Sequence, residues 1–199
     1  MMNQPVHSFV QERIGYLVLN RPEKRNALNA EMVASMKHVL KDFENNDLVK
    51  IIVIKGAGKV FCSGADLASL QDLQTNSYEE NLQDSRNLKD LFYQIYTSHK
   101  IIIAQVQGHA LAGGCGLATV CDFVFSVPEA KFGYTEVKIG FIPAIVKVFL
   151  LRKIGEGKSK QLLLDADPVS AKEAKELGLI NFIVDEEELG KTVFDYAQK

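Results

Sequence analysis

Long apolar runs, an excess of charge and paired cysteines are all missing from this sequence. No apolar run approaches the roughly 20 residues that a membrane-spanning helix needs. Lys and Arg total 23 against 25 Asp and Glu, which gives a net charge of −2. This balance offers no basic surface to a nucleic acid or to an anionic membrane, so neither is an expected partner.

The cysteines and histidines are few and are not arranged for disulfides or metals. Cys62, Cys115 and Cys121 form no CxxC pair, and an odd count argues against a disulfide framework. We expect them to be small buried hydrophobic residues. The four histidines show no ligand spacing with Cys, Asp or Glu, so no metal is expected. Residues 1–11 lack a basic segment followed by an apolar run, so we expect no signal peptide and a soluble, cytoplasmic protein.

Three common glycine- or serine-based motifs are excluded by residue type. A phosphate-binding P-loop needs Gly-Lys-Ser/Thr after Gly and four residues, but the four residues after Gly108 lead to Gly-Gly-Cys at 113–115. A dinucleotide fingerprint beginning at Gly114 would need glycine where Thr119 stands. Ser63 lacks the Gly-x-Ser-x-Gly elbow of a serine hydrolase.

What is present is an alternation of β-branched runs with amphipathic segments. The alternation predicts an α/β architecture, and 199 residues with 47% apolar content suit one domain spanning 1–199. Asn29 predicts a helix start, and Ser77 with Glu80 and Ser170 with Glu173 predict capping boxes. The expected strands are 7–12, 16–20 (joined by a turn at 14–15), 49–55, 101–107, 123–127 and 179–184, and the expected helices are 29–46, 77–96, 114–121, 143–154, 157–165, 170–178 and 186–198.

Two turns rich in small residues, 61–67 and 108–116, are the most informative feature of the chain. Each follows an apolar strand and places small residues where a new helix should begin. Backbone N–H groups at such a turn are free to donate to an anionic oxygen, and the helix dipole favours negative charge there. One donor from each turn would form an oxyanion hole, which stabilises an enolate or a tetrahedral anion.

These turns also carry a family resemblance. Asn-Arg-Pro at 20–22, Asn-Ala-Leu-Asn at 26–29, Ser-Gly-Ala-Asp-Leu at 63–67 and Ala-Gly-Gly-Cys at 112–115 resemble the crotonase family of enoyl-CoA hydratases and isomerases. Phe-Gly-Tyr-Thr-Glu at 132–136, Gly-Phe-Ile-Pro at 140–143 and residues 174–179 continue the resemblance in family order. The resemblance implies a spiral of repeated β-β-α units.

The resemblance also implies the chemistry of the site. The amides of Ala65 and Gly113 would donate to the carbonyl oxygen of an acyl thioester, and Glu136 would be the catalytic acid–base. Apolar neighbours such as Phe132 and Ile139 would desolvate this carboxylate and raise its pKa. The alternatives are small residues that serve close packing alone and a solvent-exposed glutamate.

Gly116 departs from the family pattern. Many hydratases of the family carry a second Glu at this place, and glycine has no side chain to substitute for it. One carboxylate suffices for hydration, where Glu136 takes a proton from water and returns it to Cα. It also suffices for a Δ3-Δ2 isomerase that moves a proton from C2 to C4.

Coenzyme A is expected as part of the substrate, and no separate cofactor is expected. Lys24 and Arg25 are candidates for the CoA phosphates or the adenine edge, with a solvated loop as the alternative. Lys147 is a candidate partner for a distal carboxylate of the acyl group, with a surface lysine as the alternative. The remaining residues assigned to substrate or CoA binding are Ala27, Ser63, Gly64, Asp66, Leu67, Gly114, Tyr134 and Pro143.

The predicted function is therefore hydration or dehydration of an enoyl thioester. Residues 133–155 resemble methylglutaconyl-CoA hydratase-like proteins and the dehydratases of polyketide β-branching, which implies a branched acyl group on CoA or on a carrier protein. The rivals are the isomerase and a catalytically silent acyl-CoA-binding protein.

The resemblance also bears on length and assembly. Family members usually continue into helices that cover the site and build trimers or hexamers, whereas this sequence stops at Lys199. We therefore expect a protein that is either short or truncated, with its C-terminal helical region largely absent. The homotrimer or hexamer is an expectation of the family.

Overall fold

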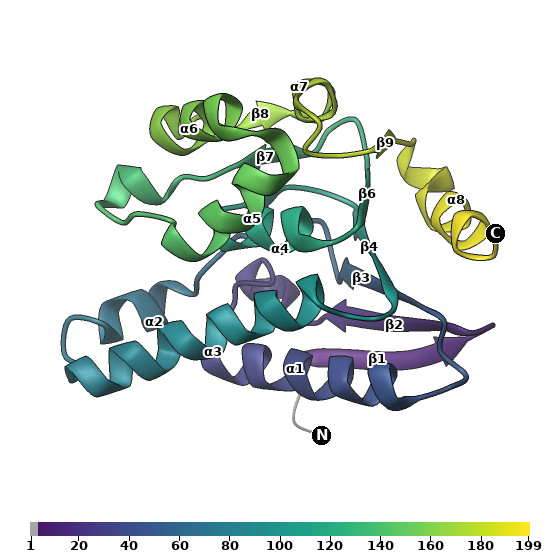
Figure 1. The fold of residues 1–199 in the computed structure, drawn as a ribbon, viewed down its shortest axis with the longest axis horizontal. Coiled ribbons are helices and arrows are strands. Elements are labelled where there is room, and N and C mark those ends of the chain that lie inside the picture. The colour runs from purple at the N-terminus through teal and green to yellow at the C-terminus, as the bar shows by residue number, and fades with distance from the viewer. Residues whose placement is uncertain (1–3) are drawn as a thin grey trace.

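The computed structural model describes residues 4–199 and contains two β-sheets with helices packed around them (Figure 1). The larger sheet has the order β1-β2-β3-β4-β6-β9, and β5-β7-β8 form the smaller one. The strands are β1 (Val6–Gln11), β2 (Ile14–Leu19), β3 (Ile51–Gly56), β4 (Ile101–Val106), β5 (Ala110–Leu111), β6 (Phe123–Ser126), β7 (Lys131–Gly133), β8 (Val169–Ser170) and β9 (Phe182–Ile183).

Eight α-helices and two short 3-10 helices connect the strands over residues 4–199. The α-helices are α1 (Ala30–Asn45), α2 (Leu67–Asp72), α3 (Tyr78–Tyr96), α4 (Gly113–Val120), α5 (Ala144–Ile154), α6 (Glu156–Asp165), α7 (Ala171–Leu177) and α8 (Glu186–Ala197), and the 3-10 helices are η1 (Pro22–Lys24) and η2 (Glu136–Ile139). The predicted α/β class is confirmed. None of the helices within residues 4–199 is long and apolar enough to cross a membrane.

The larger sheet is mixed, because β1 and β2 pair antiparallel while β2, β3, β4, β6 and β9 pair parallel. Its central strands are continuous apolar runs, which is typical of parallel strands covered on both faces. Parallel strands place their carboxyl ends at one edge of the sheet. The turns after β3 and after β4 therefore emerge at the same edge, which brings segments 61–67 and 108–116 together.

The predicted helix starts are confirmed in detail. The Asn29 side chain accepts a hydrogen bond from the Met32 amide, and Ser77 and Ser170 form the two reciprocal capping boxes with Glu80 and Glu173. Each cap satisfies backbone N–H groups that a helix start leaves unpaired. The three cysteines are buried and free, as predicted.

The first hairpin corrects the predicted turn. The turn lies at Glu12 and Arg13, which adopt φ of 46° and 69°, and not at residues 14–15. A two-residue hairpin turn of the type that matches strand twist needs positive φ at both positions. Gly15 instead lies within β2, where a Cβ would come within 2.9 Å of the Phe43 ring of α1. Glycine is present there because helix and sheet approach each other closely.

The shortest elements are not predicted from the sequence. The helix α2 and the strands β5, β7 and β8 are absent from the expected elements, and the expected last strand, 179–184, shortens to β9. Two- or three-residue strands have too few residues for a period-2 pattern, and tertiary pairing alone forms them.

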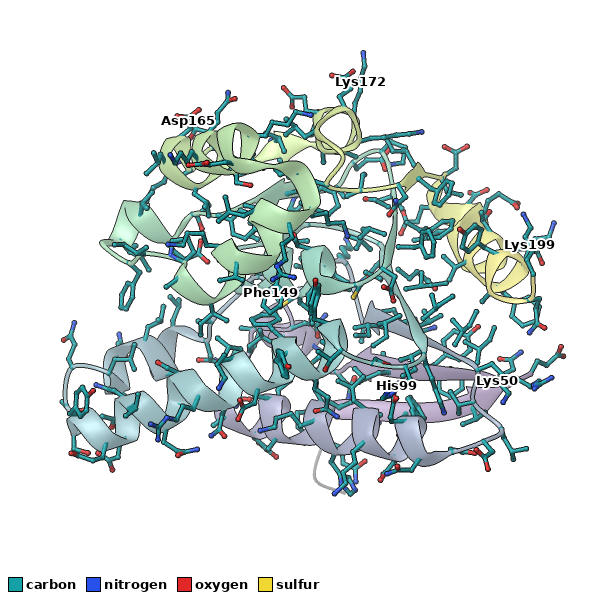
Figure 2. All side chains as sticks on the ribbon, in the orientation of Figure 1. Lys50, His99, Phe149, Asp165, Lys172 and Lys199 are labelled. Carbon is teal, nitrogen blue, oxygen red and sulfur yellow. The ribbon has the colours of Figure 1, made fainter. Side chains whose placement is uncertain are left out.

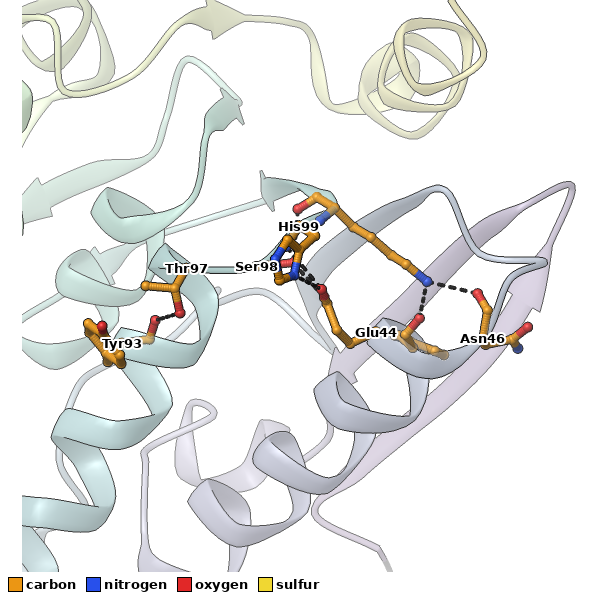
Figure 3. Close-up of polar contacts among 8 residues, drawn as sticks. Glu44, Asn46, Tyr93, Thr97, Ser98 and His99 are labelled. Carbon is orange, nitrogen blue, oxygen red and sulfur yellow. Dashed lines mark hydrogen bonds and ion pairs between the residues drawn. The ribbon is translucent and has the colours of Figure 1, made fainter.

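A polar network fixes the start of β4, the strand that leads to the 108–116 turn (Figure 3). Glu44, near the end of α1, accepts hydrogen bonds from the Ser98 hydroxyl at 2.8 Å and from the His99 amide at 3.0 Å. The Lys100 ammonium donates to the backbone carbonyls of Phe43 and Asn46, at the C-terminal end of α1. A cation there complements the helix dipole and satisfies carbonyls that the helix leaves unpaired.

Helix α5 is held against α3 and α4. The ring of Phe149, labelled near the middle of the view in Figure 2, packs at 5.2 Å from that of Tyr96 and at 6.4 Å from that of Phe92. The Lys153 ammonium donates to the carbonyls of Thr119 and Cys121 at 3.0 and 2.8 Å, at the C-terminal end of α4. The position of α5 is thereby fixed relative to the helix that begins at Gly113.

Candidate active site

The Ala65 amide is left unpaired by the way its segment binds to residue 28. The Leu28 amide donates to the Gly64 carbonyl at 2.7 Å, and the Asp66 amide donates to the Leu28 carbonyl at 2.9 Å. These two bonds hold the residues on either side of Ala65. Within residues 4–199 the Ala65 amide itself donates to no acceptor, and Ala65 is exposed.

The Gly113 amide lies beside that of Ala65. Gly113 is the first residue of α4, where a backbone N–H has no partner inside the helix, and it finds none elsewhere in the described chain. A Cβ on Gly113 would lie 4.0 Å from the Ala65 nitrogen, so the two amides are neighbours. Two unpaired donors at adjacent positions are what an oxyanion hole requires.

Gly64 explains how the two turns approach so closely. A Cβ on Gly64, which has φ of +93°, would lie 2.7 Å from the Ala112 Cβ and 3.1 Å from the Gly113 nitrogen. Ala112 itself has φ of 49° and ψ of −127°, a conformation that is energetically unfavourable for any residue with a side chain. Gly64 therefore has a packing role in the turn, and its predicted contact with substrate stays a prediction.

An ion pair holds the segment that follows Ala65. The Arg21 guanidinium lies 2.9 Å from the Asp66 carboxylate and also donates to the Ala27 carbonyl at 2.8 Å. Asp66 accepts from the Ala68 amide at 3.0 Å and so caps α2. Burial alone would raise the pKa of Asp66, but these hydrogen bonds and the charge of Arg21 outweigh it and lower the pKa below its ordinary value. Asp66 is therefore a charged structural group of the turn.

Asn26 connects the loop before α1 to the loop after β3. Its buried side chain accepts from the Arg21 amide at 3.0 Å and donates to the carbonyls of Ala57 and Val60 at 2.9 and 2.8 Å. In the sequence, Asn26 is part of the family motif at 26–29, which by itself gives it no structural role. A buried amide that makes three hydrogen bonds is the physical reason for asparagine at this position.

Glu136 has a buried carboxyl oxygen without a partner. It begins η2, and among residues 4–199 its Oε2 atom is one of two buried side-chain oxygen or nitrogen atoms with no hydrogen-bond partner. Burial raises the pKa of Glu136, and a backbone hydrogen bond opposes the rise only in part. A desolvated, unpaired carboxylate with a raised pKa is suited to accept and return a proton.

Glu136 lies close to the helix that carries the Gly113 amide. The Ala112 amide donates to the Gly133 carbonyl at 2.7 Å, which places the end of β7 beside the second turn. Burial raises the pKa of the Cys115 thiol to about 12, and the nearby charge of Glu136 adds to the rise. Cys115 lies in the first turn of α4, so the carboxylate and the free amide belong to one region.

The space beside Gly116 is filled by an apolar side chain. A Cβ on Gly116 would overlap Cγ1 of Val146 from α5, and it would lie 3.0 Å from the Val146 Cβ and 3.6 Å from the Phe92 ring. Val146 is 4% exposed. The structure therefore leaves no room for a second carboxylate at residue 116, and Glu136 has no such partner there.

We predict that Gly116→Ala destabilises the protein by about 1–3 kcal/mol, because the added methyl overpacks the contact between α4 and α5. Urea unfolding monitored by circular dichroism would measure the loss. The double variant Gly116→Ala/Val146→Ala removes the overlapping methyls and should recover much of the lost stability. Equal stabilities of wild type and Gly116→Ala would contradict the packing described here.

The structure divides the predicted substrate-binding residues by their accessibility. Those with full or partial exposure are Lys24, Arg25, Leu67, Ser63 and Pro143, and those that are buried are Ala27, Gly64, Asp66, Gly114 and Tyr134. A Cβ on Gly114 would overlap the Cys62 carbonyl oxygen, so this glycine serves close packing. Tyr134 has no exposed surface, and its hydroxyl bonds to Thr119 at 2.7 Å. Both residues are buried, and their predicted contact with substrate stays a prediction.

Two hollows of the molecule lie away from these residues. One of about 340 Å³ is lined by α6, α7 and β8, and one of about 190 Å³ lies between α1, α3 and the sheet. Neither is lined by Ala65, Gly113 or Glu136. The unpaired amides and the unpaired carboxylate are therefore the observations that locate the site.

A mixed α/β fold with two free amides at adjacent turns and a desolvated carboxylate nearby defines a class of proteins equipped to stabilise an oxyanion. The family described as "Enoyl-CoA hydratase/isomerase" matches residues 10–199, and the chain belongs to this family, the crotonases. The resemblance found in the sequence is confirmed at this level.

Named relatives agree with the family match. A Thermus thermophilus protein named "Putative enoyl-CoA hydratase" is 47% identical over 170 residues, covering 85% of this chain and 67% of the relative. The crotonyl-CoA hydratase of Syntrophomonas wolfei is 38% identical over 181 residues, covering 90% of this chain and 68% of the relative. The chain thus spans about two thirds of the length of these relatives.

Solved structures confirm the predicted crotonase fold. The crystal structure described as "putative enoyl CoA hydratase/isomerase (crotonase)" from Legionella pneumophila superposes with a TM-score of 0.95 at 36% identity. The match covers 99% of this chain and 76% of that one.

Proposed function

We propose that this protein is an enoyl-CoA hydratase, a hydro-lyase that adds water across the α,β double bond of an acyl thioester. The observation that carries the proposal is the unpaired, buried carboxyl oxygen of Glu136 near α4, together with the free amides of Ala65 and Gly113. A reaction that passes through an enolate needs both an oxyanion hole and one proton carrier. Family membership and the two named hydratase relatives point to the same reaction.

In the proposed mechanism, the thioester carbonyl oxygen accepts hydrogen bonds from Ala65 and Gly113. The Glu136 carboxylate removes a proton from a water molecule as the water oxygen bonds to Cβ. The π electrons move to the carbonyl oxygen, where the two amides stabilise the enolate. Protonated Glu136 then delivers its proton to Cα, which completes hydration and regenerates the carboxylate. Dehydration uses the same groups in reverse.

The proposal uses a single carboxylate. Val146 occupies the space beside Gly116, so a mechanism with two glutamates has no second residue there. Glu136 would accept and return the same proton, which one carboxylate can do because water and Cα react in sequence. A raised pKa suits this double role, because it makes the carboxylate a better proton acceptor than an ordinary glutamate.

We infer that coenzyme A carries the acyl group. Lys24 and Arg25 are exposed in the loop before α1, where they can approach phosphates, and the charge of Lys24 acts on Asp66 near Ala65. A branched, methylglutaconyl-like acyl group is the finer part of the proposal. It depends on the likeness of residues 133–155 and on exposed Lys147, and the relatives named above are not described as methylglutaconyl-CoA hydratases.

Incubation in oxygen-18 water would test the reaction directly. Crotonyl-CoA, 3-methylglutaconyl-CoA and a 3-enoyl-CoA would each be treated with wild type and with Glu136→Gln and examined by mass spectrometry. Uptake of one labelled oxygen that the variant loses supports a hydratase with Glu136 as its base. Double-bond migration without oxygen uptake would identify an isomerase. Unchanged thioesters would overturn the proposal.

We predict that activity falls in acid along a limb set by Glu136. The carboxylate must be deprotonated to activate water, so kcat/KM drops as pH falls through the pKa of Glu136. Because burial raises this pKa, the limb should lie above about 4.3, the ordinary value of a glutamate side chain. A pH–rate profile on crotonyl-CoA would measure it. A limb at or below the ordinary value would show that the carboxylate is hydrated in the working enzyme.

A further inference from the structure

A buried pair of hydroxyl groups joins the segment before Glu136 to α4. The Tyr134 hydroxyl lies 2.7 Å from Thr119 Oγ1, and Tyr134 has no exposed surface. Thr119 Oγ1 also donates to the carbonyl of Cys115, one turn earlier in α4, at 2.8 Å. The three groups form a short chain of hydrogen bonds in a buried region, where a low local dielectric strengthens such bonds.

This hydrogen bond matters because, within residues 4–199, the Glu136 side chain has no hydrogen bond to another residue, and the only one it accepts comes from its own backbone. Its buried oxygen has no hydrogen-bond partner among residues 4–199, so no bond to Oε2 orients the carboxylate. The position of the carboxylate must follow from the backbone of residues 133–136. The Ala112 amide fixes the Gly133 carbonyl, and the Phe141 amide donates to the Glu136 carbonyl at 3.0 Å. Between these two points, Tyr134 provides the side-chain anchor.

The other end of the anchor belongs to the helix that carries the oxyanion donor. Gly113 and Thr119 are both residues of α4, and an α-helix of eight residues is a rigid body. A change at the Tyr134–Thr119 contact therefore changes the distance between the Glu136 segment and the Gly113 amide. Misplacement of a reacting group by about 1 Å can cost a hundredfold in rate.

We propose that the hydrogen bond between Tyr134 and Thr119 positions the Glu136 carboxylate relative to the oxyanion donor of α4. Tyr134 and Thr119 are then positioning residues, which act through Glu136 and touch no substrate. The inference rests on the function proposed above, because it assigns their role in that same site. It also accounts for a buried tyrosine at a position where a phenylalanine would fill the same volume.

Tyr134→Phe is the variant that separates positioning from folding. It removes only the hydroxyl, while Thr119 keeps its hydrogen bond to the Cys115 carbonyl, so no buried polar group loses its last partner. Thr119→Val removes the other half of the pair, and Thr119→Ser restores a hydroxyl at the same position. Tyr16→Phe is a matched control, because Tyr16 is a nearly buried tyrosine of β2 outside the site.

Steady-state hydration of crotonyl-CoA would be measured for these variants. We expect Tyr134→Phe and Thr119→Val to lower kcat about tenfold with little change in KM, because binding is kept while the carboxylate is misplaced. Thr119→Ser and Tyr16→Phe should keep the wild-type kcat. Wild-type kcat in Tyr134→Phe, in a protein whose activity Glu136→Gln abolishes, would overturn the inference and leave the proposed function intact.

A second measurement does not depend on turnover. The Glu136 carboxyl can be titrated by carbon-13 NMR and assigned by its absence in Glu136→Gln. Because burial keeps the pKa of Glu136 raised, a carboxylate released from its anchor should titrate at a lower pH in Tyr134→Phe. The charge of Glu136 acts on Tyr134 and Cys115, and burial keeps both neutral in this range. If the wild type hydrates no thioester, the proposed function fails. If Glu136 titrates at the same pH in Tyr134→Phe as in the wild type, the inference about Tyr134 and Thr119 is overturned, whatever the activity.

Discussion

Glu136→Gln should lower the kcat of hydration by about 10²- to 10⁴-fold, the contribution that a positioned general acid–base makes. Glutamine keeps the size of the side chain but can neither take a proton from water nor return one to Cα. The free amides of Ala65 and Gly113 are untouched, so the thioester should still bind. We therefore expect a large fall in kcat with KM near that of the wild type.

Glu129→Gln is the matched control for this result. Glu129 is an exposed glutamate between β6 and β7, seven residues before Glu136 and on the same stretch of chain. Its neutralisation makes the same change in net charge, and its hydration rate should equal that of the wild type. A Glu136→Gln variant with wild-type kcat would remove the acid–base from the proposed mechanism.

Glu136→Gln lowers kcat but should stabilise the folded protein at neutral pH. Because burial raises the pKa of Glu136, the folded protein binds this proton more tightly than the unfolded chain does. The stabilisation that follows is complete below the ordinary glutamate pKa and is lost as pH rises through the raised pKa. Glutamine at residue 136 does not titrate, so the stability of Glu136→Gln should not fall as pH rises through the raised pKa. Thermal unfolding across pH would show a flatter profile for the variant than for the wild type.

The sequence predicts the outline of this fold because its long elements carry local signals. Asn29, Ser77 and Ser170 each satisfy a helix start through a bond within three residues, so the signal and the structure lie in the same short segment. The parallel strands are read from continuous apolar runs. The elements missed, such as β5 and β7, exist only because the two paired segments meet in space.

The candidate site shows the same difference between features with a local sequence signal and features that depend on tertiary contacts. Residues alone predicted that two small-residue turns could supply donors, while the resemblance named Ala65, Gly113 and Glu136. No local pattern connects Gly116 with Val146, thirty residues later, although their contact excludes a second carboxylate. The sequence also gives no sign that Tyr134, a predicted substrate-binding residue, is fully buried. Its role depends on Thr119, which belongs to another element.

Gly113→Pro should lower kcat by about 100- to 1000-fold, which is the usual effect of losing one oxyanion donor. Proline has no N–H, and Gly113 is the first residue of α4, the helical position that proline tolerates best. The substitution therefore deletes the proposed donor without removing a hydrogen bond that the helix makes. Hydration of crotonyl-CoA would measure the effect, with circular dichroism to verify that the helices remain.

Gly113→Ala is the control that isolates the amide. A Cβ at this position would lie 3.7 Å from the Gly64 Cα and from a Leu28 methyl, which is ordinary contact. Alanine therefore adds a side-chain carbon and keeps the N–H, so its kcat should stay much closer to the wild type than that of proline. If the two variants lost activity equally, the loss would be steric, and the oxyanion would have to be stabilised without the Gly113 amide. A loss confined to proline would mean that the negative charge of the enolate develops against this backbone N–H.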